Sequence, residues 1–239
     1  MARAVRKVRL DRSLWGLSLT VLMVVVAVAA AACGESETSS STTSSTQTTA
    51  TVGASQFGDV ALDHFYYAQI SDLAARGIVS GFEDGSFQPD EWVTRQQFAK
   101  MIVLAQGYPV SENDVCSFGD VQKDAGSLYP DNYVAVCAAE GVTQGKTSTH
   151  FAPYDNMSRA QLITMVARAA GLSELPPGEP PFADFSADHY PWAAKAYQAG
   201  LLDGLEEFKG GYSGAYDFWD NATRGEVCAL LYSLLQQDQ

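Results

Sequence analysis

The chain has 239 residues and carries 15 basic against 28 acidic side chains, which gives a formal charge of −13 at neutral pH. A chain this acidic lacks the basic footprint that binding to a nucleic-acid backbone requires, so we expect no nucleic-acid partner. Apolar residues make up 46% of the chain, which is enough for a buried core and excludes a wholly disordered protein.

The first 32 residues have the three parts of a secretory signal. Five basic side chains lie within residues 1–12, an uncharged and almost wholly apolar stretch covers 13–32, and small residues precede Cys33. The segment Ala30-Ala31-Ala32-Cys33-Gly34 is similar to a bacterial lipobox, in which the Cys is acylated and becomes the first mature residue. We therefore expect a lipid anchor on Cys33 at the outer face of the bacterial cytoplasmic membrane, facing the cell wall. A retained apolar helix and plain secretion are the alternatives.

Residues 33–56 form a predicted linker behind that anchor. They are rich in Ser and Thr and contain almost nothing that a core could bury. Removal of residues 1–32 leaves ten basic and 27 acidic side chains, a net charge of −17. The folded part is therefore repelled by anionic lipid headgroups and is expected to stay in solution above them.

Three copies of one pattern follow, and we predict repeats at 57–106, 116–171 and 180–235. Each copy opens with Phe-x-Asp-apolar and continues into an aromatic-rich helical segment, predicted over 65–76, 129–140 and 190–199. A glycine ends each of these segments, as glycines commonly end helices: Gly77, Gly141 and Gly200.

A turn-rich loop and a second helix complete each copy. Thr94, Ser158 and Thr223 each have Gln or Glu three residues later, which is the pattern of a capping box at a helix start. Apolar residues then recur at helical spacing, and the three stripes are expected to share a core: Phe98, Met101 and Ile102; Leu162, Met165 and Val166; Val227, Leu230 and Leu231. The sequence predicts a mainly α fold made of three helix-loop-helix repeats.

This combination of motifs resembles the S-layer homology (SLH) family, and the likeness covers nearly all of residues 57–235. The resemblance implies a pseudo-threefold helical bundle with short loop or strand pieces, an internal trimer within a monomer. It also implies grooves that bind cell-wall polysaccharide, often one carrying pyruvate ketals. Residues 146–150 and 206–220 depart from the family pattern, so we expect one or two grooves to be weakened or lost.

Three arginines, Arg95, Arg159 and Arg224, hold the first position of the second helices. A cation there opposes the helix dipole, but together with free amide groups it suits a bound anion. The resemblance implies that these arginines contact the polysaccharide and that further residues lie along the grooves: Gly77, Ile78, Gly141 and Gly200. The other interpretation is that each arginine pairs with an acid of its own fold, for example Asp59, Asp120 or Asp184, and only joins the loop to the helix.

Several tryptophans and histidines have more than one possible role. Trp92, Trp192 and Trp219 either stack on sugar rings or serve the scaffold. His64, His150 and His189 lack the spacing of metal ligands, so we expect no metal site and no cofactor. His64 and His189 fall at equivalent distances from the repeat openings and are interpreted as scaffold.

The cysteines bear on the redox state and on catalysis. Export permits a disulfide between Cys116 and Cys137, with free thiols as the alternative, and Cys228 is predicted to be a buried free thiol. No motif ties a base to a nucleophile, so we expect a non-catalytic binding protein. An envelope protein whose repeats dock a protein partner instead of a sugar is the second hypothesis.

Overall fold

The computed structural model describes residues 56–173 and 178–237. The predicted signal, Cys33 and all but the last residue of the linker lie outside these ranges. Within them no helix is both long and apolar enough to cross a membrane. The elements in chain order are α1 (Tyr67–Ala75), α2 (Arg95–Gln106), α3 (Asp131–Ala139), α4 (Arg159–Ala169), α5 (Tyr190–Gln198), two 3₁₀ turns, η1 (Leu201–Gly204) and η2 (Glu206–Phe208), and α6 (Arg224–Gln237).

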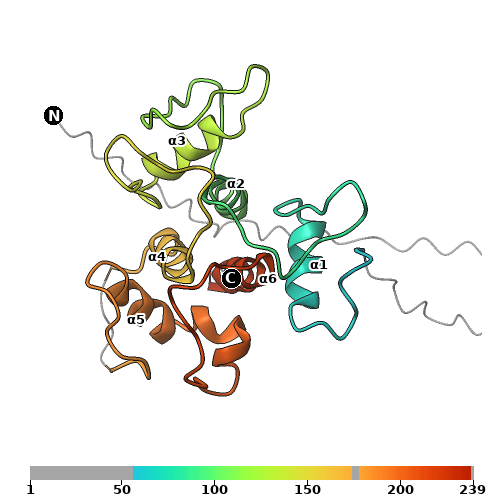
Figure 1. Ribbon diagram of the computed structural model, residues 1–239, viewed down its shortest axis with the longest axis vertical. Helices are drawn as coiled ribbons and strands as arrows, with labels where there is room; N and C mark the ends of the chain where they lie inside the picture. The colour runs from blue at the N-terminus through green and yellow to red at the C-terminus, as the bar shows by residue number, and fades with distance from the viewer. Residues whose placement is uncertain (1–55, 174–177, 238–239) are drawn as a thin grey trace, which may run out of the picture. The chain divides into compact units, whose positions relative to one another are not determined.

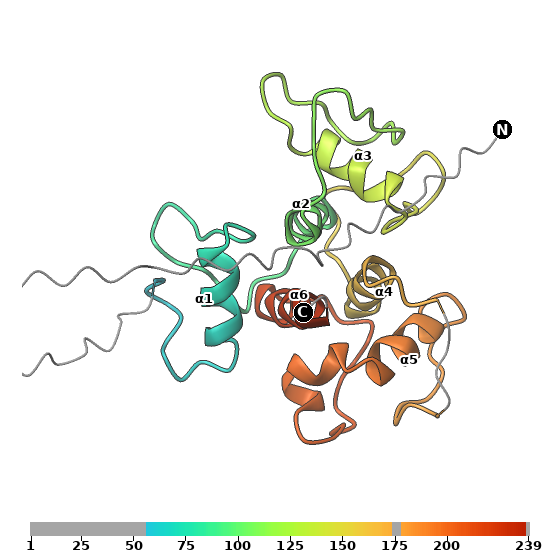
Figure 2. The same ribbon diagram turned by 180° about the vertical axis from the view of Figure 1, so that it is seen from behind.

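Three helices, α2, α4 and α6, form the middle of the fold. They contact one another, and both views of the ribbon show them together inside the other three helices (Figures 1 and 2). The predicted apolar stripes face this centre, since every residue in them is buried except Met101, which is partly buried. A single hydrophobic cluster joins the stripes, which confirms the predicted shared core.

The outer helices interlock the repeats. α1 packs on α6, α3 on α2 and α5 on α4, so each outer helix contacts an inner helix from a different repeat (Figure 1). A helix stabilised by packing needs a partner for its apolar face. No repeat therefore completes its own core, and the three fold as one unit.

Backbone contacts link the loops that lead into the inner helices. Isolated bridges join Thr94 to Asn156, Ser158 to Asn221 and Trp92 to Thr223, which makes a closed cycle of three contacts. These bridges are the only β structure in the described ranges. The predicted mainly α fold is confirmed, with isolated bridges and no strand in the described ranges. Pseudo-threefold symmetry stays a prediction.

The helix ends follow the predicted signals. Ser158 and Gln161 form reciprocal capping bonds of 3.3 and 3.4 Å, and Thr223 and Glu226 do the same at 2.9 and 3.3 Å. At the first of the three starts, the Thr94 N–H donates to Gln97 Oε1 at 2.9 Å. Gly77, Gly141 and Gly200 have φ of 71°, 74° and 72°, the left-handed conformation that ends a helix and favours glycine.

One sequence correspondence was wrong. The residues that precede the first turn of α1, α3 and α5 are Tyr66, Pro130 and His189. His189 therefore occupies the position of Tyr66, whereas His64 lies two residues earlier and accepts a hydrogen bond from the Tyr66 N–H. Counting from the repeat opening misses this because the three opening segments are not in register with their helices.

Candidate anion-binding grooves

The amide groups at the starts of the inner helices are already bonded. The Arg95 N–H donates to the Asp155 carbonyl at 3.0 Å, Arg159 to Asp220 at 2.9 Å and Arg224 to Glu91 at 2.9 Å. The next amide in each helix also donates to a loop carbonyl. The expectation that free helix amides join the guanidinium in holding an anion was therefore wrong, because the loop cycle uses them.

Arg95 and Arg224 are nearly buried, at 4% and 6% exposure of the whole residue. Each Nε donates to a loop carbonyl at 2.7 Å, Arg95 to Phe151 and Arg224 to Phe87, and each group lies over the ring of that same phenylalanine. Burial lowers the pKa of both arginines. They remain charged at neutral pH because their ordinary value is so high.

Two aspartates of the repeat openings bind the backbone amides of the same two loops. Asp120 accepts from the Phe151 and Ala152 amides at 2.9 and 2.7 Å, and Asp59 accepts from those of Phe87 and Gln88 at 2.7 and 2.6 Å. Partial burial opposes ionisation, but the amide bonds together lower the pKa of both carboxyls.

The third aspartate departs from this pattern, since Asp184 accepts from the Ser186 amide. No arginine in the described ranges forms an ion pair with Asp59, Asp120 or Asp184. Pairing with one of these three aspartates is therefore wrong, but Arg159 does pair with other acids of its own fold, Glu207, Asp220 and Glu226. Arg95 and Arg224 are linked to Asp120 and Asp59 only through the loop residues that both members of each pair bind.

Groove 1, headed by Arg95, has a volume of about 440 Å³. Its wall combines the loop 143–146 with α4 and the start of α5, and its charged and titratable lining residues are Arg95, Lys146, Arg168, Asp188 and His189. Arg95 also donates to Gln161 Oε1 at 3.3 Å. Lys146 pairs with Asp155, whereas Arg95 and Arg168 form no ion pair in the described ranges. Unpaired cations in so acidic a chain make this groove suited to an anion.

His189 adds a neutral hydrogen-bonding group to groove 1. Its Nδ1 lies 2.8 Å from Thr164 Oγ1, and its ring meets Trp219 edge-on with centroids 5.9 Å apart. Burial lowers its pKa, and the cations Arg168 and Arg95 act in the same direction against the opposing effect of Asp188. At neutral pH it therefore offers an uncharged imidazole.

Groove 2 is the counterpart headed by Arg224, with a volume of about 190 Å³. Its wall uses the equivalent parts of the first repeat, the loop 78–82 and α2, together with Tyr129. Lys100 is its second cation, and Arg224 donates to the Ser80 carbonyl at 2.8 Å. Groove 2 is thus smaller and carries fewer charges than groove 1.

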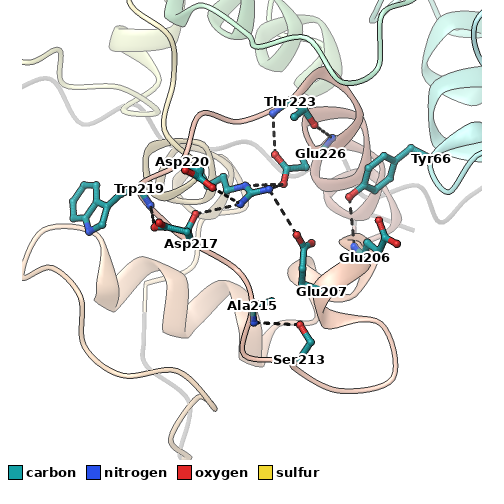
Figure 3. Close-up of polar contacts among 11 residues, drawn as sticks. Tyr66, Glu206, Glu207, Ser213, Ala215, Asp217, Trp219, Asp220, Thr223 and Glu226 are labelled. Carbon is teal, nitrogen blue, oxygen red and sulfur yellow. Dashed lines mark hydrogen bonds and ion pairs between the residues drawn. The ribbon is translucent and has the colours of Figure 1, made fainter.

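Arg159, which the same order of repeats would place at the head of a third groove, has a different environment (Figure 3). Its Nε and Nη2 lie 2.8 and 2.7 Å from Glu226 Oε1, with Glu207 at 3.7 Å and Asp220 at 3.4 Å. Burial raises the pKa of the Glu226 carboxyl, although Arg159 partly offsets this. We call Arg159, Glu207, Asp220 and Glu226 the Arg159 cluster.

The glycines and Ile78 proposed for the grooves have separate positions. Ile78 lines groove 2, while Gly141 lines a neighbouring hollow that shares Gln144 and Arg168 with groove 1. Gly77 and Gly200 are found at the helix ends described above. Their contact with a ligand stays a prediction.

The sequence reading missed the groove 1 residues Lys146, Arg168, Gln161 and His189. Lys146 and Arg168 are two of only ten basic side chains outside the predicted signal peptide. This scarcity is the sequence feature that could have pointed to them. The capping pattern explains Gln161 only as a helix cap, yet its side chain also lines groove 1 and accepts a hydrogen bond from Arg95.

The tryptophans and cysteines singled out in the sequence have the following environments. Trp92 and Trp219 are largely exposed, whereas the Trp192 ring lies 4.3 Å from Lys195 Nζ and 5.2 Å from the Arg168 guanidinium. Cys116, Cys137 and Cys228 are free, so the disulfide considered for Cys116 and Cys137 is not formed. Within the described ranges no three His, Cys, Asp or Glu side chains are arranged to hold a metal.

Comparison with known proteins bears on this arrangement. Residues 56–99 and 117–163 match the sequence model of the S-layer homology domain. The chain therefore contains S-layer homology domains at these two ranges. The two matches cover the first two of the three predicted SLH repeats.

The relatives that match the chain are much longer proteins. It is 31% identical to S-layer protein EA1 of Bacillus anthracis over 130 residues, 54% of this chain and 14% of that protein. It is 30% identical to a cell surface protein of Thermoanaerobacter kivui over 62% of this chain and 18% of that protein. An endoglucanase of Bacillus sp. strain KSM-635 is 29% identical over 76% of this chain and 19% of its own length. The chain thus spans under a fifth of each relative.

Proposed function

We propose that this SLH protein attaches to an acidic cell-wall polysaccharide through grooves 1 and 2. The observation that carries the proposal is groove 1, where Arg95, Lys146 and Arg168 gather in a protein with a large negative charge. A carboxylate on a sugar, such as a pyruvate ketal, supplies the matching charge. The side-chain amides of Gln144 and Gln161 and the His189 imidazole supply hydrogen bonds for hydroxyl groups.

The relatives support an envelope location for such a binding module. S-layer and cell surface proteins share these domains with the chain, which favours an exported protein held at the cell wall. We further propose that Cys33 carries the lipid anchor, so that the protein links the membrane to the wall. In this proposal the SLH unit is a non-catalytic monomer.

Co-sedimentation with purified bacterial cell walls tests the proposal. The compact unit 51–239 is mixed with walls before and after mild acid has removed ketal-linked pyruvate. We expect binding to intact walls and at least tenfold weaker binding to treated walls. Equal binding to both would reject the acidic sugar, and binding to neither would shift the weight to docking of a protein partner.

A paired variant assigns the binding to groove 1. Lys146→Gln combined with Arg168→Gln removes two charges while keeping long polar side chains. The matched control, Lys123→Gln with Lys209→Gln, removes the same charge at positions that do not line groove 1 or groove 2. Only the first pair should weaken binding to intact walls.

A further inference from the structure

Three loop residues beside the starts of the inner helices occupy one equivalent position: Asp90, Tyr154 and Trp219. The carbonyls of the residues before and after each of them accept hydrogen bonds from the first two amides of an inner helix, which is α6 for Asp90, α2 for Tyr154 and α4 for Trp219. The backbone is therefore fixed on both sides of each residue. Two of the three positions hold an aromatic ring, and Trp219 has the larger one.

Trp219 lies at the rim of groove 1. Its ring meets His189, which lines that groove, with the two centroids 5.9 Å apart. The loop that carries Trp219 is bonded to α4, the helix that forms one wall of the same groove. The ring points away from the Arg159 cluster (Figure 3). Trp219 therefore belongs to the surroundings of groove 1 and not to those of Arg159.

The Trp219 side chain is exposed and yet held in place. More than half of the residue, 54%, is open to solvent. Single exposed aromatic residues are common on protein surfaces, so exposure alone assigns no role. Trp219, however, also meets the Phe185 ring edge-on at 6.0 Å, and its own N–H donates to Asp217 Oδ1 at 2.9 Å. A ring fixed in this way loses little conformational freedom when a ligand packs on it.

The polar groups next to Trp219 suit a neutral sugar. Asp188 is the one carboxylate that lines groove 1, and it precedes His189 in the chain. A carboxylate disfavours an anionic sugar nearby but accepts hydrogen bonds from the hydroxyl groups of a neutral one. The apolar C–H face of a pyranose ring can pack on the indole, while its hydroxyl groups meet Asp188 and the His189 imidazole.

We propose that Trp219 is a stacking platform at groove 1 for a neutral sugar that adjoins the acidic sugar in the same polysaccharide. The inference rests on the proposed function and deepens it, because it adds a second sugar to the unit that groove 1 recognises. The cations of the groove hold the charged sugar, and Trp219 holds its neutral neighbour. Groove 1 then distinguishes a polymer segment from the acidic sugar alone.

NMR titration of the full-length chain with probes of two sizes tests the inference. The smaller probe is a methyl N-acetylhexosaminide with a 4,6-linked pyruvate ketal. The larger probes add one neutral N-acetylhexosamine to this sugar, at O3 in one and at O1 in the other. The amide signals of Gln144 and Gln161 report the affinity of groove 1. We expect one larger probe to bind there about three- to tenfold more tightly than the smaller probe.

Three variants assign this gain to the ring. Trp219→Ala should remove the gain and leave the affinity for the smaller probe unchanged, which also shows that groove 1 is intact. Trp219→Tyr should keep most of the gain, because a tyrosine already holds the equivalent position at residue 154. Trp92→Ala is the matched control and should keep the gain in full, since Trp92 is a tryptophan of the same loop cycle that is 56% exposed and lines neither groove.

The outcomes separate this inference from the proposed function. Binding of the smaller probe with no gain for either larger probe, or a gain that Trp219→Ala retains, would overturn the inference and leave the proposed function in place. A gain that depends on Trp219 but persists after acid has removed the ketal from the larger probe would support the platform and contradict the acidic sugar. Absence of shifts at Gln144 and Gln161 with every probe would overturn both.

Discussion

Arg95 and Asp120 hold the same residue, Phe151, through its two backbone polar groups. The arginine donates to its carbonyl at 2.7 Å, and the aspartate accepts from its amide at 2.9 Å. Arg224 and Asp59 hold Phe87 in the same way at 2.7 Å each. The arginine that heads a groove is thus also a clamp on the loop of another repeat, which fixes its guanidinium before any ligand arrives.

Asp120→Asn should lower the free energy of unfolding by about 1.5–3 kcal/mol, the usual contribution of hydrogen bonds to a charged group. Urea unfolding at pH 7 measures the loss. The control is Asp124→Asn, which makes the same change on a loop residue whose side chain forms no ion pair in the described ranges. Equal effects of the two variants would contradict the clamp.

The contribution of Asp120 should also depend on pH. Its pKa in the fold lies below its ordinary value of about 3.9. The stabilisation is therefore complete above that ordinary value and is lost as the pH falls through the lower folded value. The unfolding free energies of the original protein and of Asp120→Asn should converge in acid, and a gap that stays constant with pH would contradict the argument.

Gly81→Ala should destabilise the fold by about 1–3 kcal/mol, as overpacking does. A Cβ at Gly81 would lie 2.5 Å from both the Phe57 ring and the Ser86 carbonyl. Gly58→Ala is the control, because a Cβ there meets nothing within 4 Å. Thermal unfolding should separate the two variants, and equal melting temperatures would show that the loop relaxes freely.

The thiols should react in a fixed order. Burial raises the pKa of Cys137 and Cys228 to about 12, whereas Cys116 is partly exposed. In a Cys33→Ala chain at pH 8, a thiol-specific disulfide reagent should label only Cys116 until denaturant is added. Intact mass then provides the check, since a protein two mass units lighter with one reactive thiol after unfolding would establish the Cys116–Cys137 disulfide.

His189 should titrate below the ordinary histidine value of about 6.5, because burial and the cations Arg168 and Arg95 disfavour its charged form. The depressed value means that protonation costs stability as the pH falls from about 6.5 through the folded pKa. Nitrogen-detected NMR of the imidazole measures this value, and His189→Gln removes the signal for assignment. A pKa above 6.5 would indicate that Asp188 outweighs the cations.

The sequence predicted the helices well because their signals are local. Capping boxes, terminal glycines and apolar spacing depend on neighbouring residues, and they located α2, α4 and α6 from the first residue. The site required contacts between repeats, which local patterns do not encode. Gln161 and Glu226 look alike as capping residues, and only the structure shows that Gln161 also contacts Arg95 and that Glu226 also pairs with Arg159.

The position of the arginines at the helix starts also led to a wrong prediction about the groups that surround them. A helix start normally offers free amides, but here these amides donate to carbonyls of the loops. The loop carbonyls belong to other repeats, as in the bond between Arg95 and Asp155. Asp120 and Asp59 lie near Arg95 and Arg224 but bind the loop backbone instead of the arginines. Neither outcome follows from the residues of one repeat alone.

Amide NMR of the compact unit during titration with purified, pyruvylated wall polysaccharide tests the central claim most directly. We predict that the signals of Gln144, Lys146, Gln161 and Arg168 in groove 1 shift together, that those of Phe82 and Lys100 in groove 2 follow, and that those of Lys123 and Lys209 outside both grooves stay unchanged. Shifts confined to the exposed Trp92 and Trp219, or no shifts at all, would contradict binding in the arginine-headed grooves.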